Sequence, residues 1–178
     1  MQSGKIDRAG DGAWQHGSAA SFCAAGLWVV FCDGSALPNP GAMGIGAILI
    51  DPAGIGHTLS QVTSTKGCNN EAELRALIAA LHEASRLGAT ELQVHSDSAL
   101  LVEQLGALPV KPIARLALLF DEARALLQAF PCIRLQWIPG HRNGAADALA
   151  RAALGLSRSP PGAPSSGKGK KHKSKRSR

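Results

Sequence analysis

The segment VVFCDGSALPNPG, residues 29–41, joins a run of apolar residues to a carboxylate and a turn. The apolar run is rich in β-branched and aromatic side chains, which is typical of a buried strand, and we predict a strand from Leu27 to Asp33. Burying a carboxylate without a partner is costly, so Asp33 requires a hydrogen-bond network, a cation or a metal. Gly34 and the Pro/Gly-rich residues that follow then break the chain into turns.

Two more strands follow this turn. Residues Gly44 to Ile50 form a second apolar run, and Asp51-Pro52-Ala53-Gly54 has the composition and length of a hairpin turn. A third, more polar strand from about Ile55 to Thr63 suits the edge of a sheet. Together, the three strands predict an antiparallel meander.

Helices and strands alternate after the meander. The helix from about Asn70 to Gly88 carries Leu74, Leu77, Ile78 and Leu81 at the spacing of a core-facing stripe. The remaining predicted elements are a strand Leu92–Asp97, a short helix Ser98–Leu105, a helix Ile113–Phe130, a strand Cys132–Ile138 and a helix Ala145–Leu156. This order, β-β-β-α-β-α-α-β-α, predicts an α/β fold with a five-stranded mixed sheet, in which two parallel strands extend the meander and helices flank the sheet.

Composition is that of one globular domain with a basic tail. The chain has 178 residues, of which 45% are hydrophobic and 18% charged. The segment from Arg158 to Arg178 holds eight of the 19 Lys and Arg residues and none of the 13 acids, so the rest of the chain is slightly acidic. We expect an extension without fixed structure at residues 1–25, the folded domain at 26–156 and a disordered basic tail at 157–178.

The four cysteines occur singly, without the paired spacing of a zinc site or a disulfide framework. This pattern favours a reduced, intracellular chain, and we expect a cytoplasmic protein. The apolar run from Ala19 to Cys32 has an alternative interpretation as a signal peptide, but the mixed charges before it favour a buried strand. No segment of the sequence is long and apolar enough to suggest a membrane span.

Four acids fall at the ends of strands or on adjacent helices: Asp33, Glu73, Asp97 and Asp147. If the first and fourth predicted strands are neighbours, Asp33 and Asp97 emerge side by side, and Glu73 and Asp147 can face them from helices. Such a cluster repels itself without cations, and carboxylate oxygens suit Mg²⁺. Taken singly, each acid also has a structural interpretation, because Glu73 and Asp147 suit the first turn of a helix and Asp97 suits an N-cap.

Several short motifs occur together in a distinctive order. They are Asp33-Gly34-Ser35 with Asn39-Pro40-Gly41, Asn69-Asn70 before Glu73-Leu74, Ser96-Asp97-Ser98, Trp137-Ile138-Pro139-Gly140-His141, and Asn143 before Asp147-Ala148-Leu149-Ala150. In this order the sequence resembles type 1 ribonuclease H over about residues 27–156. Each motif is weak alone, whereas the ordered set is specific.

The resemblance implies an endonuclease that cuts the RNA strand of RNA–DNA hybrids by a two-metal-ion mechanism and leaves 5′-phosphates. It implies that Asp33, Glu73, Asp97 and Asp147 bind two Mg²⁺ ions, with Mn²⁺ as a substitute. It gives His141 the role of a mobile proton shuttle, a task that suits the near-neutral pKa of free histidine.

The resemblance also implies contacts to nucleic acid. Asn39, Asn69 and Asn70 would reach RNA 2′-hydroxyls or base edges, although asparagine is also common in turns and at helix starts. Cys68 replaces a Thr that many relatives have in the pocket for a DNA-strand phosphate, and Lys66 is a nearby source of charge. The segment between Leu105 and Ile113 is too short for the basic protrusion of some relatives. The tail, with Lys170, Lys171 and Lys173, would contact phosphates, or else serve as a solubilising or targeting segment.

Two alternative functions fit the same residues. One is a catalytically silent hybrid-binding or RNA-binding module of the same fold, and the other is a nuclease of this fold that acts on double-stranded RNA. The presence of all four carboxylates and His141 favours an enzyme. We expect a monomer whose partner is an RNA–DNA hybrid, with no membrane and no obligatory protein partner.

Overall fold

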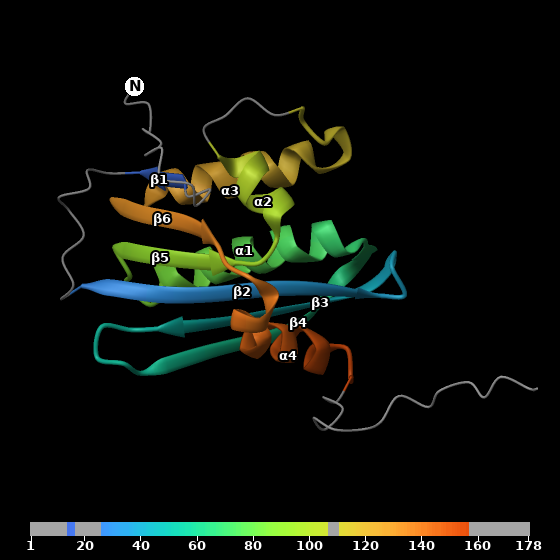
Figure 1. The fold of residues 1–178 in the computed structure, drawn as a ribbon, viewed down its shortest axis with the longest axis horizontal. Coiled ribbons are helices and arrows are strands. Elements are labelled where there is room, and N and C mark those ends of the chain that lie inside the picture. Colours follow the sequence, from blue (N-terminus) through green and yellow to red (C-terminus); the bar gives the residue numbers. More distant parts are fainter. Residues whose placement is uncertain (1–13, 17–25, 107–110, 157–178) are drawn as a thin grey trace, which may run out of the picture.

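A computed structural model describes residues 14–16, 26–106 and 111–156 of the chain. These residues form one mixed sheet with helices on both faces (Figure 1). The order across the sheet is β1-β6-β5-β2-β3-β4, which puts β2 in its interior. Strands β2, β5 and β6 are parallel to one another, whereas β1, β3 and β4 run antiparallel to their neighbours. The predicted α/β fold with its meander and two parallel strands is therefore confirmed.

The strands match the predicted positions more closely than the predicted ends. They are β1 (Trp14–His16), β2 (Leu27–Leu37), β3 (Gly41–Ile50), β4 (Gly56–Gly67), β5 (Glu91–Ser96) and β6 (Cys132–Trp137). The prediction that the first strand stops at Asp33 is wrong, because Gly34 to Leu37 continue to pair with β3. The turn lies instead at Pro38–Pro40.

Strand β1 was not predicted. It pairs antiparallel with β6, from Trp14 opposite Leu135 to His16 opposite Ile133. The prediction of an unstructured extension at residues 1–25 is therefore wrong for these three residues. The rest of that extension up to residue 25, like the whole predicted tail at residues 157–178, lies outside the described residues.

The helices are α1 (Asn69–Arg86), α2 (Ala99–Leu105), α3 (Ala117–Ala129) and α4 (Gly144–Ala153), with short 3₁₀ turns η2 (Ala114–Leu116) before α3 and η3 (Gly140–Arg142) before α4. The predicted stripe on α1 is buried, since Leu74, Leu77 and Leu81 have no exposed surface. Leu92, Val94, Ile133 and Leu135 join it in the main core from the sheet. None of the described helices has both the length and the apolar character needed to cross a membrane.

Candidate active site

The sheet brings Asp33 and Asp97 together, as predicted. Strands β2 and β5 are parallel neighbours, with Phe31 opposite His95, and the rings of these two residues stack at 4.9 Å between centroids. Side chains two residues apart on a strand share a face, so Asp33 and Asp97 project from the same face, one step further along. Asp97 directly follows β5, whereas Asp33 stays within the β2 ladder opposite Gly46.

Glycines allow two helices to approach this point from opposite faces of the sheet. A Cβ on Gly34 would lie 2.0 Å from the backbone carbon of Ala72 in α1, so any other residue would push α1 and Glu73 away. On the other face, a Cβ on Gly46 would lie 2.4 Å from the carbonyl oxygen of Ala146 in α4. Because Gly46 is opposite Asp33, the same close contact carries Asp147 toward Asp33.

Glu73 is held by a serine at the start of α2. The Ser98 hydroxyl donates a hydrogen bond to Glu73 Oε2 at 2.5 Å, and the Ser98 hydroxyl oxygen accepts one from the backbone N–H of Leu101 at 3.3 Å. Ser98 is therefore both the N-cap of α2 and a donor to the carboxylate. The sequence predicted a helix starting at Ser98 but gave no indication of the bond to Glu73.

Asp97 is held by groups from β6 and from the start of α4. Its Oδ1 accepts a hydrogen bond of 2.6 Å from Asn143 Nδ2, and its backbone carbonyl accepts one of 3.0 Å from the Trp137 indole. The side chain also lies against Gly140, where a Cβ would come within 3.0 Å of Asp97 Oδ2. Trp137, Gly140 and Asn143 belong to the motifs quoted above, but the sequence did not predict these contacts.

Burial and the neighbouring acids raise the pKa values of Asp33 and Glu73. Burial, followed by the nearby charge of Asp97 and then those of Asp147 and Glu73, raises the pKa of Asp33 to about 7, even though the Gly34 N–H donates to this carboxylate. Burial and the Asp97 charge also raise the pKa of Glu73 above its ordinary value, against the opposing effect of the Ser98 hydrogen bond. The four predicted acids therefore share one negatively charged site in which charge is incompletely compensated.

The carboxylate oxygens of the site are suitable ligands for a hard cation, but they do not form a complete coordination shell. Among the residues that the structure describes, no three His, Cys, Asp or Glu side chains are placed to hold a metal ion as they stand. Carboxylate oxygens are the ligands that Mg²⁺ prefers, and Mg²⁺ typically keeps several waters and binds through one or two carboxylates plus substrate phosphates. An open, acidic site of this kind suits a cation that is completed by a substrate.

The predicted asparagines lie at the turn between β2 and β3 and at the start of α1. Asn39 Oδ1 accepts a hydrogen bond from the Asn69 backbone N–H at 3.2 Å, and Asn69 Oδ1 accepts one from the Ala36 N–H at 2.8 Å. Asn39 and Asn69 are exposed, whereas Asn70 is partly buried. These bonds tie the turn to α1, and the exposed amides remain on the surface of the same region.

Charge near Cys68 comes from a residue that the sequence did not single out. Arg115 Nη1 donates to Cys68 Sγ at 3.1 Å. Burial alone would raise the pKa of this thiol, but the Glu71 N–H and the Arg115 guanidinium outweigh it, so the pKa lies below its ordinary value.

Lys66 is exposed and pairs with Ala42 in the sheet. Residues Lys170, Lys171 and Lys173 lie outside the described residues, and His141 is exposed in η3.

Comparison with known proteins agrees with this architecture. Residues 31–153 match the family model described as reverse transcriptase-like. The bifunctional protein Rv2228c of Mycobacterium tuberculosis is 39% identical over 128 residues, which are 71% of this chain and 35% of that protein. Ribonuclease HI of Halobacterium salinarum is 36% identical over 126 residues, which are 70% of this chain and 62% of that protein. The chain thus spans about a third of the length of its mycobacterial relative.

Solved structures of ribonucleases H1 are also similar to this chain. Ribonuclease H1 from Halobacterium salinarum superposes with a TM-score of 0.69 at 31% identity, covering 73% of this chain and 98% of that one. LC11 ribonuclease H1, solved in complex with an RNA/DNA hybrid, gives a TM-score of 0.64 at 31% identity, covering 72% of this chain and 96% of that one. The chain belongs to the reverse transcriptase-like family and, within it, to the type 1 ribonucleases H.

Proposed function

We propose that the protein is an endoribonuclease that hydrolyses the RNA strand of RNA–DNA hybrids, leaving 5′-phosphate and 3′-hydroxyl ends. The observation that carries this proposal is the acidic site itself, in which burial and three further carboxylates raise the pKa of Asp33 to about 7. Structural Asp residues rarely gather in this way, because each like charge destabilises the others. The family membership of the chain supports the same reaction class.

Asp33, Glu73, Asp97 and Asp147 would hold divalent cations, with Mg²⁺ as the expected ion and Mn²⁺ as a substitute. When bound, these ions supply the positive charge that activates a water molecule and stabilises the leaving oxygen during phosphodiester cleavage. The chain's own contribution is rigid placement: Asp33 lies within a paired strand, Ser98 orients Glu73, and Asn143 and Trp137 fix Asp97. His141, which is exposed and follows the Gly140 that lies against Asp97, would move the proton that the leaving 3′-oxygen requires.

Selection of RNA would come from the turn that carries Asn39. Its side chain and that of Asn69 are exposed at the junction of β2 and α1, where Asn70 and Lys66 also lie. An amide both donates and accepts hydrogen bonds, so it can recognise a 2′-hydroxyl, which DNA lacks. We propose that this end of the sheet contacts the minor groove of the hybrid.

The basic tail would add contacts to phosphates that do not depend on sequence. Such contacts release counterions and weaken with salt. Deleting residues 158–178 should raise the KM for hybrid and flatten its dependence on salt, with kcat nearly unchanged. Equal KM values for the two proteins at low salt would contradict this role.

The experiment that tests the function is a comparison of duplexes. Labelled RNA–DNA, RNA–RNA and DNA–DNA duplexes of one sequence are incubated with the protein and Mg²⁺ or Mn²⁺, and the products are separated by length. We expect cleavage of the RNA strand of the hybrid alone. Tight binding without cleavage would instead support the silent binding module, and preferential cutting of RNA–RNA would support the double-stranded RNA nuclease.

A further inference from the structure

Asn143 is the residue directly before α4, but its side chain does not cap the helix in the ordinary way. An asparagine at this position usually accepts a hydrogen bond from the helix start through its side-chain oxygen. Here the side chain makes no capping bond, and only the backbone carbonyl accepts, from the N–H groups of Ala146 and Asp147. The residue is 1% exposed, and its Oδ1 is buried without a hydrogen-bond partner among the described residues.

The amide nitrogen of Asn143 instead bridges two other elements. It donates to Asp97 Oδ1 at 2.6 Å and to the carbonyl oxygen of Cys32 at 3.0 Å. Cys32 directly precedes Asp33 in β2, and Asp97 directly follows β5. One neutral side chain therefore connects the backbone beside Asp33, the carboxylate of Asp97 and the helix turn that carries Asp147.

The Asn143 amide holds Asp97 in place although the acids of the site repel one another. The acids repel one another, as the raised pKa of Asp33 records. A cationic bridge would neutralise the site and compete with any metal, whereas an amide N–H fixes a carboxylate oxygen without adding charge. The buried, unpartnered Oδ1 shows that the orientation of the amide is set through its nitrogen, at the cost of an unmade hydrogen bond.

We propose that Asn143 is a positioning residue of the carboxylate site: its amide sets the orientation of Asp97 relative to Asp33 and Asp147 before any cation or substrate arrives. The proposal rests on the proposed function, because its consequence is a faster reaction on the hybrid. It differs from a purely structural role, in which Asn143 would only start α4. Groups that orient metal ligands typically change metal affinity or activity by about 10- to 100-fold when they are removed.

Asn143→Ser separates the two roles. Serine is as good an N-cap as asparagine, but its side chain is too short to reach Asp97. Relative to the unmodified protein, we expect kcat on the hybrid to fall by at least about tenfold, with KM changed by less than about twofold. The melting temperature should also fall, because two buried hydrogen bonds are lost. Asn143→Asp keeps the shape of the side chain but loses the amide donor, and it should lose kcat in the same way if the serine variant does not fold.

The matched control is Ala152→Gly, an exposed change in α4 that weakens the helix without touching the acids. It should lower the melting temperature and leave kcat unchanged. Calorimetric titration of the metal-free proteins with Mg²⁺ gives a readout that does not depend on activity, and we expect weaker binding by Asn143→Ser than by either the unmodified protein or Ala152→Gly.

The outcomes are distinguishable. If the unmodified protein cuts the hybrid and Asn143→Ser matches it in kcat and Mg²⁺ binding, the inference is wrong while the proposed function stands. If kcat falls in Ala152→Gly in proportion to its melting temperature, as in Asn143→Ser, the role is only structural and the inference is again wrong. If the unmodified protein cuts nothing, the function fails, and the Mg²⁺ titration still decides on Asn143.

Discussion

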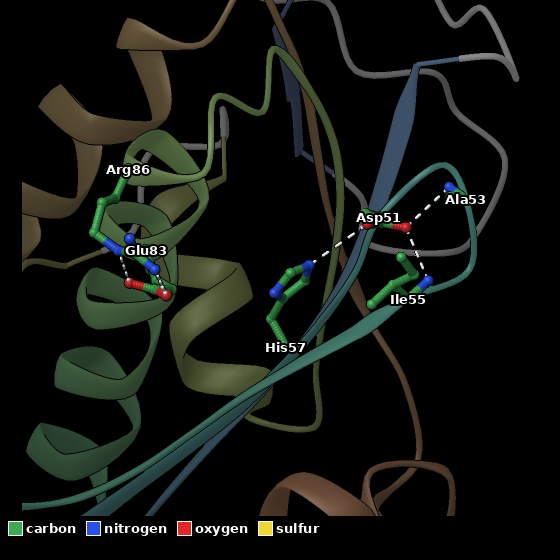
Figure 2. A network of polar contacts seen from close by, with 6 residues as sticks. All are labelled: Asp51, Ala53, Ile55, His57, Glu83 and Arg86. Carbon is green, nitrogen blue, oxygen red and sulfur yellow. Dashed lines mark hydrogen bonds and ion pairs between the residues drawn. The ribbon is translucent and has the colours of Figure 1, made fainter.

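Two aspartates near the β2–β3 pair have opposite surroundings. Asp51 follows β3, and its carboxylate accepts hydrogen bonds from the N–H groups of Ala53 and Ile55 at 2.9 and 2.8 Å, with His57 Nε2 3.5 Å away (Figure 2). These hydrogen bonds, that of Ile55 foremost, hold the pKa of Asp51 below its ordinary value. Asp33, within β2, has a pKa raised to about 7 by burial and by Asp97.

The surroundings of Asp51 stabilise the fold, whereas those of Asp33 suit a functional site. The Asp51 turn gives its carboxylate the partners that it needs, and His57 adds a stacking contact with Trp28 at 5.5 Å between ring centroids. The Asp33 site gathers more acids and supplies few donors. A fold gains stability from the first arrangement and loses it from the second. The second is therefore expected only where the charge is needed for another purpose.

The largest expected effect comes from removing each charge in turn. Asp33→Asn should reduce hybrid cleavage by at least about 10³-fold, because a charged ligand of the cations is lost. Asp51→Asn, a matched change outside the site, should leave the rate within about twofold. The rates are measured on one labelled hybrid at saturating Mg²⁺.

The effects of these two variants on melting temperature should be the reverse of their effects on rate, with the larger loss in Asp51→Asn. In metal-free buffer near neutral pH, Asp33→Asn should melt at the same temperature as the unmodified protein or higher, since repulsion is relieved. Asp51→Asn should melt lower, because the carboxylate hydrogen bonds to the turn are weakened. A large loss of melting temperature in Asp33→Asn would show that this carboxylate is structural.

An intermediate effect is expected from Ser98, which belongs to the site but carries no charge. Ser98→Ala removes the donor to Glu73 and should lower kcat by about tenfold, as expected for a hydrogen bond to a charged group. Ser98→Thr keeps the hydroxyl and serves as the control, with a rate close to that of the unmodified protein. Equal rates for both variants would mean that Glu73 is held by other contacts.

The smallest effect is a difference in pH dependence, measured by thermal melts in metal-free buffer. Between its ordinary pKa of 3.8 and about 7, folded Asp33 keeps a proton that the unfolded chain has released. Its contribution to stability therefore falls as pH rises through this range, and the advantage of Asp33→Asn should grow from about pH 4 to 7. Asp51 has a lowered pKa, so its contribution is present above its ordinary pKa of 3.8 and is lost as pH falls through the lowered value. Parallel pH curves for the two variants would remove the distinction between the two sites.

Much of this site follows from the sequence, because its acids mark the ends or faces of regular elements. Once the first and fourth predicted strands are taken as neighbours, Asp33 and Asp97 come side by side, although Asp33 lies within β2 and not at its end. The continuation of β2 through Gly34 to Leu37 could not be predicted, since this segment has the composition of a turn and is ordered by pairing with β3. Strand β1 was missed for the same reason: it is three residues long and is defined by its distant partner β6.

Side-chain contacts between distant elements were the least predictable part. The bonds from Asn143 to Asp97, from Ser98 to Glu73 and from Arg115 to Cys68 depend on how closely α1, α4 and η2 approach the sheet or one another. The close approach of α1 and α4 depends in turn on Gly34 and Gly46, where a Cβ would collide with helix backbone. The spacing of apolar residues in the sequence predicts which face of a helix or strand is buried, but it does not predict these distances between elements.

The most direct test of the central claim is calorimetric titration with Mg²⁺ of the metal-free protein, Asp33→Asn and Asp51→Asn. If the acids around Asp33 form the cation site, the unmodified protein and Asp51→Asn should bind Mg²⁺ alike, and binding by Asp33→Asn should be strongly weakened or lost. Equal binding by all three proteins would contradict the claim, because the cation would then be held elsewhere.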